Sequence, residues 1–273
     1  MSDFLETMRA SSLQRARHAM AQRPLKTVVQ AALQRQAAPA LTPSAKGFDI
    51  IGEVKRSSPA HGELSAESVD ALVDRARAYA RAGAVAVSVL TEPQRFGGDL
   101  AHLEKIAHGL HPLGVPAMRK DFIVDVYQVW EAAAAGAGGV LLILRLLDDF
   151  QINSMIEAAA RAKMFVLLEA FDGSDLRRAR NFVQGHPQLL VGLNARNLAT
   201  LEVEFERLPQ LAGKFPPGCV RVAESGMASN EQVREVAQAG YAMALVGTAL
   251  MKQRQPAKFL QDLLIAGRRS IAG

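Results

Sequence analysis

Eight short apolar runs recur along this chain of 273 residues, and most of them end in charged, amide, hydroxyl or glycine residues. The runs cover residues 48–52, 84–90, 115–118, 138–144, 164–168, 189–193, 220–223 and 242–246. Helix-like stretches alternate with them at residues 68–82, 99–110, 126–137, 149–163, 173–184, 230–238 and 256–266. Strands that alternate with helices pair in parallel through right-handed crossovers. The pattern therefore predicts an α/β fold whose strand ends gather reactive groups into one site.

Two α/β architectures compete for this pattern. A doubly wound open sheet normally carries a glycine-rich phosphate loop after its first strand, but the first run here leads into Glu53, Lys55 and Ser58. Glycine-bearing turns instead follow the last two runs, where barrels commonly bind phosphate. Residues 47–273 also provide the length that eight strand–helix units need. We therefore expect a (β/α)8 TIM barrel.

The first 46 residues have the pattern of a helical extension in front of the barrel. Apolar positions from Leu5 to Met20 recur at roughly helical spacing, and Pro24 is placed to open a second helix. A linker with two prolines follows at residues 38–43. We expect residues 1–46 to pack on a barrel formed by residues 47–273, the whole making a single domain.

Composition limits the expected partners and compartment. The net charge of +5 arises in the first 46 residues, which hold seven Lys or Arg residues against two Asp or Glu residues. Phe4 is the single aromatic residue there, whereas nucleic-acid binders combine a basic face with stacking side chains, so no nucleic-acid partner is expected. No apolar stretch approaches the roughly 20 residues that cross a bilayer, so no membrane partner is expected either. The single cysteine, Cys219, favours a reducing, cytoplasmic location.

Two small-residue turns follow the last two predicted strands. Glu224, Ser225 and Gly226 end the seventh run, and Gly247 and Thr248 end the eighth. Small residues let backbone N–H groups approach an anion, and the helix that follows each turn adds its dipole. A single glycine of this kind is more often only a turn. The pair, after the last two strands of a barrel, indicates a phosphate site.

Two lysines and three glutamates stand at the ends of predicted strands. Lys55 and Lys120 are costly to desolvate without an anionic partner, and Glu53, Glu169 and Glu224 occupy equivalent positions. A lysine beside a carboxylate can act as a general acid next to a general base. The structural alternative is lysines that extend to solvent and glutamates that form ion pairs across the barrel mouth.

Further polar residues follow the sixth run. Asn194 and Arg196 offer neutral and charged donors for hydroxyl or carboxylate groups, although a structural bridge from Arg196 to a glutamate is the alternative. None of the six histidines stands at a predicted strand end, and no pair of them has convincing ligand spacing. No metal site is therefore expected.

Seven segments resemble the indole-3-glycerol phosphate synthase family and occur in the family's order. They are IGEVKRSSP (51–59), VSVLTE (87–92) with FGG (96–98), RKDF (119–122), LE (168–169), GLNARNL (192–198), ESG (224–226) and LVG (245–247). The resemblance implies a carboxy-lyase of tryptophan biosynthesis that needs no cofactor and works as a monomer or weak homodimer. Its substrate would be 1-(2-carboxyphenylamino)-1-deoxyribulose 5-phosphate, a sugar phosphate that bears an anthranilate ring.

The resemblance also implies roles for the matched residues. Lys120 would be the general acid of ring closure, Glu169 the base, and Lys55 a second acid or phosphate partner in the dehydration, while Glu53 and Glu224 would orient the lysines. Asn194 and Arg196 would hold polar substrate groups. The residues around the carboxylate or phosphate ends would be Ser58, Ser225, Gly226, Gly247 and Thr248, and the apolar wall for the aryl ring would be Phe96, Phe122, Leu142 and Leu201.

The chain departs from the family pattern at three positions. Phe171 stands two residues after Glu169, where a histidine is common, His61 replaces a lysine, and Arg95 replaces an aromatic residue. These changes leave open a paralogue that acts on a substituted anthranilate in a secondary pathway. A phosphoribosylanthranilate-type isomerase on the same fold is the second alternative.

Overall fold

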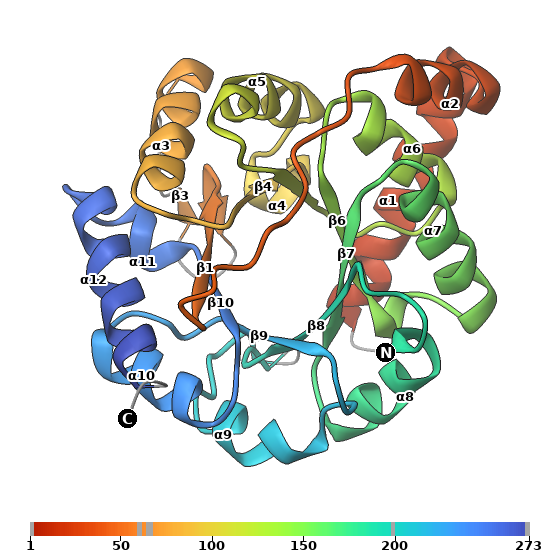
Figure 1. Cartoon of the computed structure of the whole chain (residues 1–273). Helices are drawn as coiled ribbons and strands as arrows, with labels where there is room; N and C mark the ends of the chain where they lie inside the picture. Colours follow the sequence, from red (N-terminus) through yellow and green to blue (C-terminus); the bar gives the residue numbers. More distant parts are fainter. Residues whose placement is uncertain (1–2, 59–61, 64–67, 198–199, 271–273) are drawn as a thin grey trace.

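The computed structural model describes residues 3–58, 62–63, 68–197 and 200–270. Parallel strands close into a barrel in the order β1-β10-β9-β8-β7-β6-β5-β4, and helices surround it (Figure 1). The strands are β1 (Asp49–Val54), β4 (Ala86–Leu90), β5 (Ala117–Lys120), β6 (Gly139–Ile143), β7 (Phe165–Ala170), β8 (Leu189–Asn194), β9 (Val220–Glu224) and β10 (Met243–Val246). The predicted (β/α)8 TIM barrel is confirmed.

The helices around the barrel begin and end where the sequence supplies caps. They are α3 (Val69–Arg81), α5 (Leu100–Leu110), α6 (Val126–Ala134), α7 (Asp149–Arg161), α8 (Gly173–Val183), α10 (Asn230–Gln238) and α12 (Pro256–Arg269). All but α12 follow a Ser or Asp whose side chain accepts a hydrogen bond from a first-turn N–H group. Gly83, Gly136 and Gly240 follow α3, α6 and α10 with positive φ angles of 103°, 90° and 91°, a backbone conformation that glycine adopts readily at helix C-termini.

Most of the barrel strands extend beyond the apolar segments seen in the sequence, so the polar residues that follow those segments belong to the strands. β5 ends at Lys120, β7 includes Glu169, and β9 ends at Glu224. The register pairs Glu169 with Ile143 of β6, and Glu224 with Asn194 of β8. Because paired residues of parallel neighbours point to the same side of a sheet, the ladder brings these polar side chains to the barrel interior.

Two N-terminal helices, α1 (Asp3–Gln22) and α2 (Leu25–Gln34), precede the barrel strands and pack against α6 (Figure 1). Buried hydrogen bonds accompany this packing: Gln128 Nε2 donates to Ser12 Oγ at 2.9 Å. The Tyr127 hydroxyl lies 3.1 Å from the carbonyl oxygen of Ala19. The contacts hold α1 against the side of the barrel that contains β5 and β6. Among the described helices, none has both the length and the apolar character that a membrane crossing requires.

Several short elements lie in the loops and are not predicted from the sequence. They are the hairpin β2 (Ser57–Ser58) and β3 (Gly62–Glu63), the helices α4 (Pro93–Phe96), α9 (Arg207–Leu211) and α11 (Thr248–Met251), and the 3-10 turns η1 (His111–Leu113), η2 (Leu144–Leu146) and η3 (Ala212–Lys214). None is long enough to show a hydrophobic period. Four of these elements, β2, α4, η2 and α11, closely follow a barrel strand at the end where the site lies.

Candidate active site

A cavity of about 540 Å³ opens at the carboxyl ends of the barrel strands. Every strand of the barrel contributes to its lining: Glu53 of β1, Leu90 of β4, Lys120 of β5, Leu141 and Ile143 of β6, Glu169 of β7, Asn194 of β8, Glu224 of β9, and Leu245 and Val246 of β10. The volume is typical of small-molecule sites. Closure of the barrel thus brings groups from the whole length of the chain to one place.

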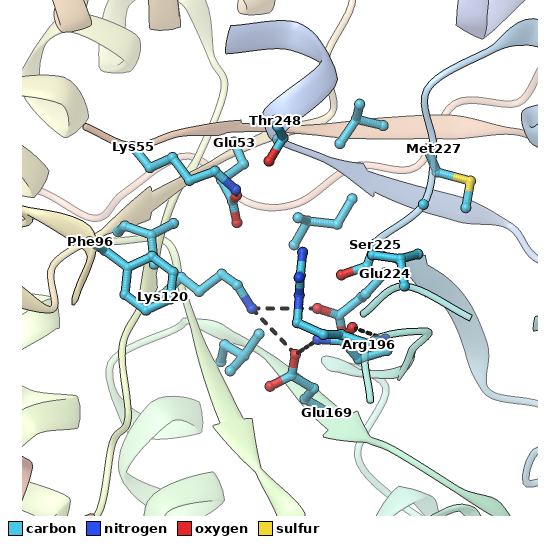
Figure 2. A pocket seen from close by; sticks show the side chains of 18 of the residues that line it. Glu53, Lys55, Phe96, Lys120, Glu169, Arg196, Glu224, Ser225, Met227 and Thr248 are labelled. Carbon is cyan, nitrogen blue, oxygen red and sulfur yellow. Dashed lines mark hydrogen bonds and ion pairs between the residues drawn. The ribbon is translucent and has the colours of Figure 1, made fainter. Parts of the chain in front are cut away.

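Lys120 lies between two carboxyl groups in this cavity (Figure 2). Its Nζ donates to Glu169 Oε1 at 3.4 Å and lies 3.6 Å from Glu224 Oε2. Burial lowers the pKa of Lys120, but the negative charges of Glu169, Glu224 and Glu53 outweigh burial, and the net shift is upward. Lys120 is therefore an ammonium at neutral pH, which is the form that a general acid needs.

Glu169 and Glu224 have different surroundings. Asn194 Nδ2 donates to Glu169 Oε1 at 2.7 Å, so that oxygen accepts from two donors. Within the described ranges, neither oxygen of Glu224 has a hydrogen-bond partner, although the residue is only 1% exposed. Burial raises the pKa of Glu224 well above its usual value, and the nearby Glu169 raises it further against the opposing effect of Lys120.

Glycine in β8 makes room for the Glu224 carboxyl group. A Cβ atom on Gly192 would lie 2.0 Å from Glu224 Oε1, which is far inside van der Waals contact. The Glu224 side chain therefore packs directly on the backbone of the neighbouring strand. Any larger residue at this position has to displace the carboxyl group.

Lys55 forms a second lysine–glutamate pair, separate from Lys120. Its Nζ donates to Glu53 Oε1 at 2.5 Å. A Cβ atom on Gly247 would lie 2.2 Å from Glu53 Oε1 and 2.9 Å from Lys55 Nζ. The Lys55–Glu53 pair thus packs against the turn after β10, whereas Lys120 lies beside Glu169. The two lysines face different parts of the cavity (Figure 2).

The turns after β9 and β10 form the small-residue part of the lining, with Ser225, Gly226, Gly247 and Thr248. Ser225 and Gly226 both have positive φ, 66° and 84°. A serine in this region is uncommon, and such backbone conformations concentrate at functional sites. Helix α11 starts at Thr248, and the first N–H groups of a helix have no acceptor within it. The turns therefore offer backbone donors to an anion.

Apolar side chains line the other side of the cavity. The ring centroid of Phe122 lies 6.3 Å from that of Phe96 and 5.8 Å from that of Phe4, the latter in an edge-to-face arrangement. Phe171 and Leu201 also line the cavity. Flat, apolar walls of this kind suit an aromatic ring.

Arg196 is fixed within its own loop. Its backbone N–H donates to Asn194 Oδ1 at 2.9 Å, and its Nη1 donates to the carbonyl oxygen of Leu201 at 2.5 Å. Leu201 has a φ of 61°. Like Ser225 in the turn after β9, it is a non-glycine residue of the cavity lining with left-handed backbone conformation. Burial lowers the pKa of Arg196, and Glu53 and Glu169 oppose that shift.

The structure brings all but two of the residues predicted for the site to this cavity. Ser58 belongs to β2, but its side chain lies outside the described part of the structure. The prediction that Leu142 lines the cavity is wrong. Leu142 pairs with Leu168, whereas its neighbours Leu141 and Ile143 line the cavity, and alternate residues of a strand face opposite sides. Leu142 therefore points toward the surrounding helices.

Comparison with known proteins decides the family. The family model for indole-3-glycerol phosphate synthase matches residues 4–263. The chain belongs to the indole-3-glycerol phosphate synthase family. An indole-3-glycerol phosphate synthase from Beutenbergia cavernae is 41% identical over 249 residues, which cover 89% of this chain and 88% of the relative. One from Micrococcus luteus is 42% identical over 215 residues, 79% of this chain and 77% of the relative. The resemblance found in the sequence is confirmed.

Solved structures of more distant proteins share the fold. The 3-hexulose-6-phosphate synthase from Salmonella typhimurium has a TM-score of 0.61 at 15% identity and covers 82% of this chain and 99% of its own. The thiamine phosphate pyrophosphorylase from Pyrococcus furiosus has a TM-score of 0.57 at 16% identity, with coverages of 83% and 98%. At such low identity these matches support the barrel alone.

The structure describes two of the three departures from the indole-3-glycerol phosphate synthase family pattern. The Phe171 ring lines the cavity, and the Arg145 guanidinium lies 5.4 Å from its centroid, a cation–π contact. Arg95 lies in α4, where its carbonyl oxygen accepts a hydrogen bond from Ser57 Oγ at 2.9 Å. His61 lies outside the described residues.

Several lining residues are not predicted from the sequence. Phe4 and Leu5 reach the cavity from α1, and Val203, Phe205 and Met227 reach it from the loops after β8 and β9. Phe4 carries one weak signal, because it is the single aromatic residue of the first 46. The others depend on how the loops fold, and no local pattern marks them. Among the described residues, no cluster of His, Cys, Asp or Glu is arranged to hold a metal ion.

Proposed function

We propose that this chain converts 1-(2-carboxyphenylamino)-1-deoxyribulose 5-phosphate into indole-3-glycerol phosphate, with release of CO2 and water. The observation that carries the proposal is Lys120, a half-buried ammonium 3.4 Å from Glu169 in a cavity that also has small-residue turns and an aromatic wall. This reaction makes the chain a carboxy-lyase of tryptophan biosynthesis, in keeping with its family.

The cavity offers a place for each part of this substrate. The turns at Ser225–Gly226 and Gly247–Thr248, with Lys55 beside the second, would bind the phosphate. Phe96 and Phe122 would hold the aryl ring. Arg196 and Asn194 would bind polar groups between these ends. The carbonyl group to be attacked then lies near Lys120 Nζ.

Ring closure needs an acid at the carbonyl oxygen. The ring carbon that bears the carboxylate attacks the ketone carbon, and Lys120 gives its proton to the ketone oxygen, which becomes a hydroxyl group. The iminium formed by the attack accepts the electron pair of the bond between the ring carbon and the carboxylate carbon as CO2 leaves. The substrate therefore supplies its own electron sink, and this step requires no cofactor.

Dehydration needs an acid and a base together. A second proton goes to the departing hydroxyl group, and Glu169 removes a proton from the adjacent ring carbon to complete the indole. Lys120 and Lys55 are both ammonium donors that line the cavity. Glu169, which accepts hydrogen bonds from Asn194 and Lys120, is oriented to act as the base.

The proposal is tested with the purified chain and the carboxyphenylamino-deoxyribulose phosphate. We expect indole absorbance and fluorescence to appear together with CO2 in a one-to-one ratio. Phosphoribosylanthranilate is the matched alternative substrate, and we expect no isomerisation of it. Turnover of phosphoribosylanthranilate without formation of an indole would contradict the proposal.

The proposed reaction needs no partner other than the phosphorylated substrate, because one chain supplies every strand end of the cavity. This agrees with a monomer or a weak homodimer. A cytoplasmic location is part of the proposal and rests on the single cysteine.

A further inference from the structure

Glu224 is buried beside the Glu169 carboxylate and accepts no hydrogen bond among the described residues, although Lys120 Nζ lies 3.6 Å from its Oε2. We propose that Glu224 works in its protonated form and returns a proton to Lys120 after Lys120 has protonated the substrate. Glu224 thus acts through Lys120: it stores the proton that the reaction consumes and passes it to the lysine. The inference rests on the proposed function.

The distances around Lys120 place one positive charge between two carboxyl groups. Nζ lies 3.4 Å from Glu169 Oε1 and 3.6 Å from Glu224 Oε2. Two carboxylates that share one ammonium in a buried site do not titrate independently, and one of them retains a proton. The pair therefore holds one proton at neutral pH.

Hydrogen bonding decides which of the two carboxyl groups holds this proton. Glu169 accepts from Asn194 at 2.7 Å and from Lys120, and donors of this kind stabilise the ionised form. Among the described residues Glu224 accepts no hydrogen bond and has a longer ion pair with Lys120, and a buried charge without hydrogen bonds is costly. The proton therefore resides on Glu224, from which it can bond to the Glu169 carboxylate.

The other charged groups of the cavity favour the same assignment. Glu53 of β1 faces Glu224 and raises its pKa, as does Glu169 of β7, whereas Lys120 of β5 lowers it. Lys55 is engaged with Glu53 at 2.5 Å. Arg196 donates to the carbonyl oxygen of Leu201. Burial and the two glutamates outweigh Lys120, so the net effect raises the pKa of Glu224.

The stoichiometry of the proposed reaction requires a stored proton. When the substrate carboxyl group is ionised, the products contain one proton more than the substrate. Two protons go to the oxygen that leaves as water, and the base recovers one. A single proton must therefore enter the site in each turnover.

Glu224 can supply this proton in one transfer. An Nζ–H bond of Lys120 breaks as the substrate O–H bond forms, which leaves a neutral amine. The O–H bond of Glu224 then breaks as a new Nζ–H bond forms, and Glu224 becomes a carboxylate. Lys120 is again an ammonium, and solvent reprotonates Glu224 when the product leaves.

Infrared spectroscopy tests the protonation state without any assay of activity. A protonated carboxyl group has a C=O stretch separate from the bands of carboxylates. We expect this band in the wild-type protein at neutral pH, its loss in Glu224→Gln, and its retention in Glu157→Gln, a control at an exposed glutamate of α7. Absence of the band from the wild type, or its persistence in Glu224→Gln, would overturn the proposal.

Kinetics test the transfer itself. Glutamine has the shape of a neutral carboxyl group but cannot give up a proton, so we expect kcat of Glu224→Gln to fall by about 100-fold or more. An unchanged kcat would overturn the relay. If Glu224→Gln does not fold, Glu169→Gln provides the test, because removal of that charge must make the band disappear at a lower pH. A wild type that shows the band but forms no indole would refute the proposed function and leave the protonation state standing.

Discussion

Arg15 of α1 and Asp121, the residue after Lys120, form a two-point ion pair with N–O distances of 2.8 and 3.0 Å. Asp121 also accepts from Thr91 Oγ1 at 2.7 Å and from Arg119 Nη2 at 3.2 Å. Its side chain is fully buried. The N-terminal helix is thus fastened to the strand end that carries the proposed general acid.

This ion pair predicts a pH-dependent contribution to stability. Burial raises the pKa of Asp121, but Arg119 and Arg15 outweigh burial and lower it to about 2. A carboxyl group with a lowered pKa stabilises the fold above its unfolded pKa of about 4, and this contribution is lost as the pH falls toward 2. We expect Asp121→Asn to lower the free energy of unfolding by about 2 kcal/mol at pH 7.

Urea denaturation at pH 7 and at pH 3 measures the effect. The deficit of Asp121→Asn relative to the wild type should shrink at the lower pH. The matched control is Asp74→Asn, whose exposed ion pair with Arg77 should contribute less than about 1 kcal/mol. An equal deficit at both pH values would show that the Asp121 charge is not the cause.

Gly192 provides a test of how closely the Glu224 carboxyl group packs. Because a Cβ atom there would lie 2.0 Å from Glu224 Oε1, Gly192→Ala must displace the carboxyl group. We expect kcat to fall by about 10-fold or more, because a small misplacement of a catalytic group slows the reaction. We also expect the free energy of unfolding to fall by about 1–3 kcal/mol, because the added methyl group overpacks the barrel interior. Gly213→Ala is the control, because no atom lies within 4 Å of a Cβ at that position. Steady-state kinetics with unchanged kcat in Gly192→Ala would contradict the assigned packing.

The barrel was predictable because each strand and helix carries its own local signal. The run at residues 164–168 is apolar and ends in Glu169, and Ser68 and Asp99 cap the helices that follow them. These signals act over a few residues. Their regular alternation predicts a parallel α/β fold, and the glycine turns after the last two strands favour the closed barrel over the open sheet.

The sequence does not predict those features of the site that depend on strand register or on contacts between residues far apart in the chain. Whether Leu141 or Leu142 faces the cavity depends on strand register, and a shift of one residue reverses the answer. The approach of Phe4 to Phe122 joins residues that are far apart in the chain. The different states of Glu169 and Glu224 depend on Asn194, a donor from a third strand. None of these relationships is visible in a local pattern.

The pair Leu141 and Leu142 tests the corrected register. Both leucines are buried, so each alanine variant should lose about 2–5 kcal/mol of stability. Only Leu141 lines the cavity on the structural assignment. We expect Leu141→Ala to raise KM for the substrate and Leu142→Ala to leave KM near the wild-type value. A raised KM in Leu142→Ala alone would restore the original prediction.

The most direct test of the account is the rate of indole formation by Lys120→Ala beside the wild type, at saturating substrate and neutral pH. Loss of a general acid should lower kcat by about 10²–10⁴-fold. The melting temperature should change little, because residues at the catalytic ends of barrel strands contribute mainly to function. The claim that Lys120 is the general acid would be contradicted by a folded Lys120→Ala protein that retains more than about a tenth of the wild-type kcat. That activity is well above what loss of a general acid leaves.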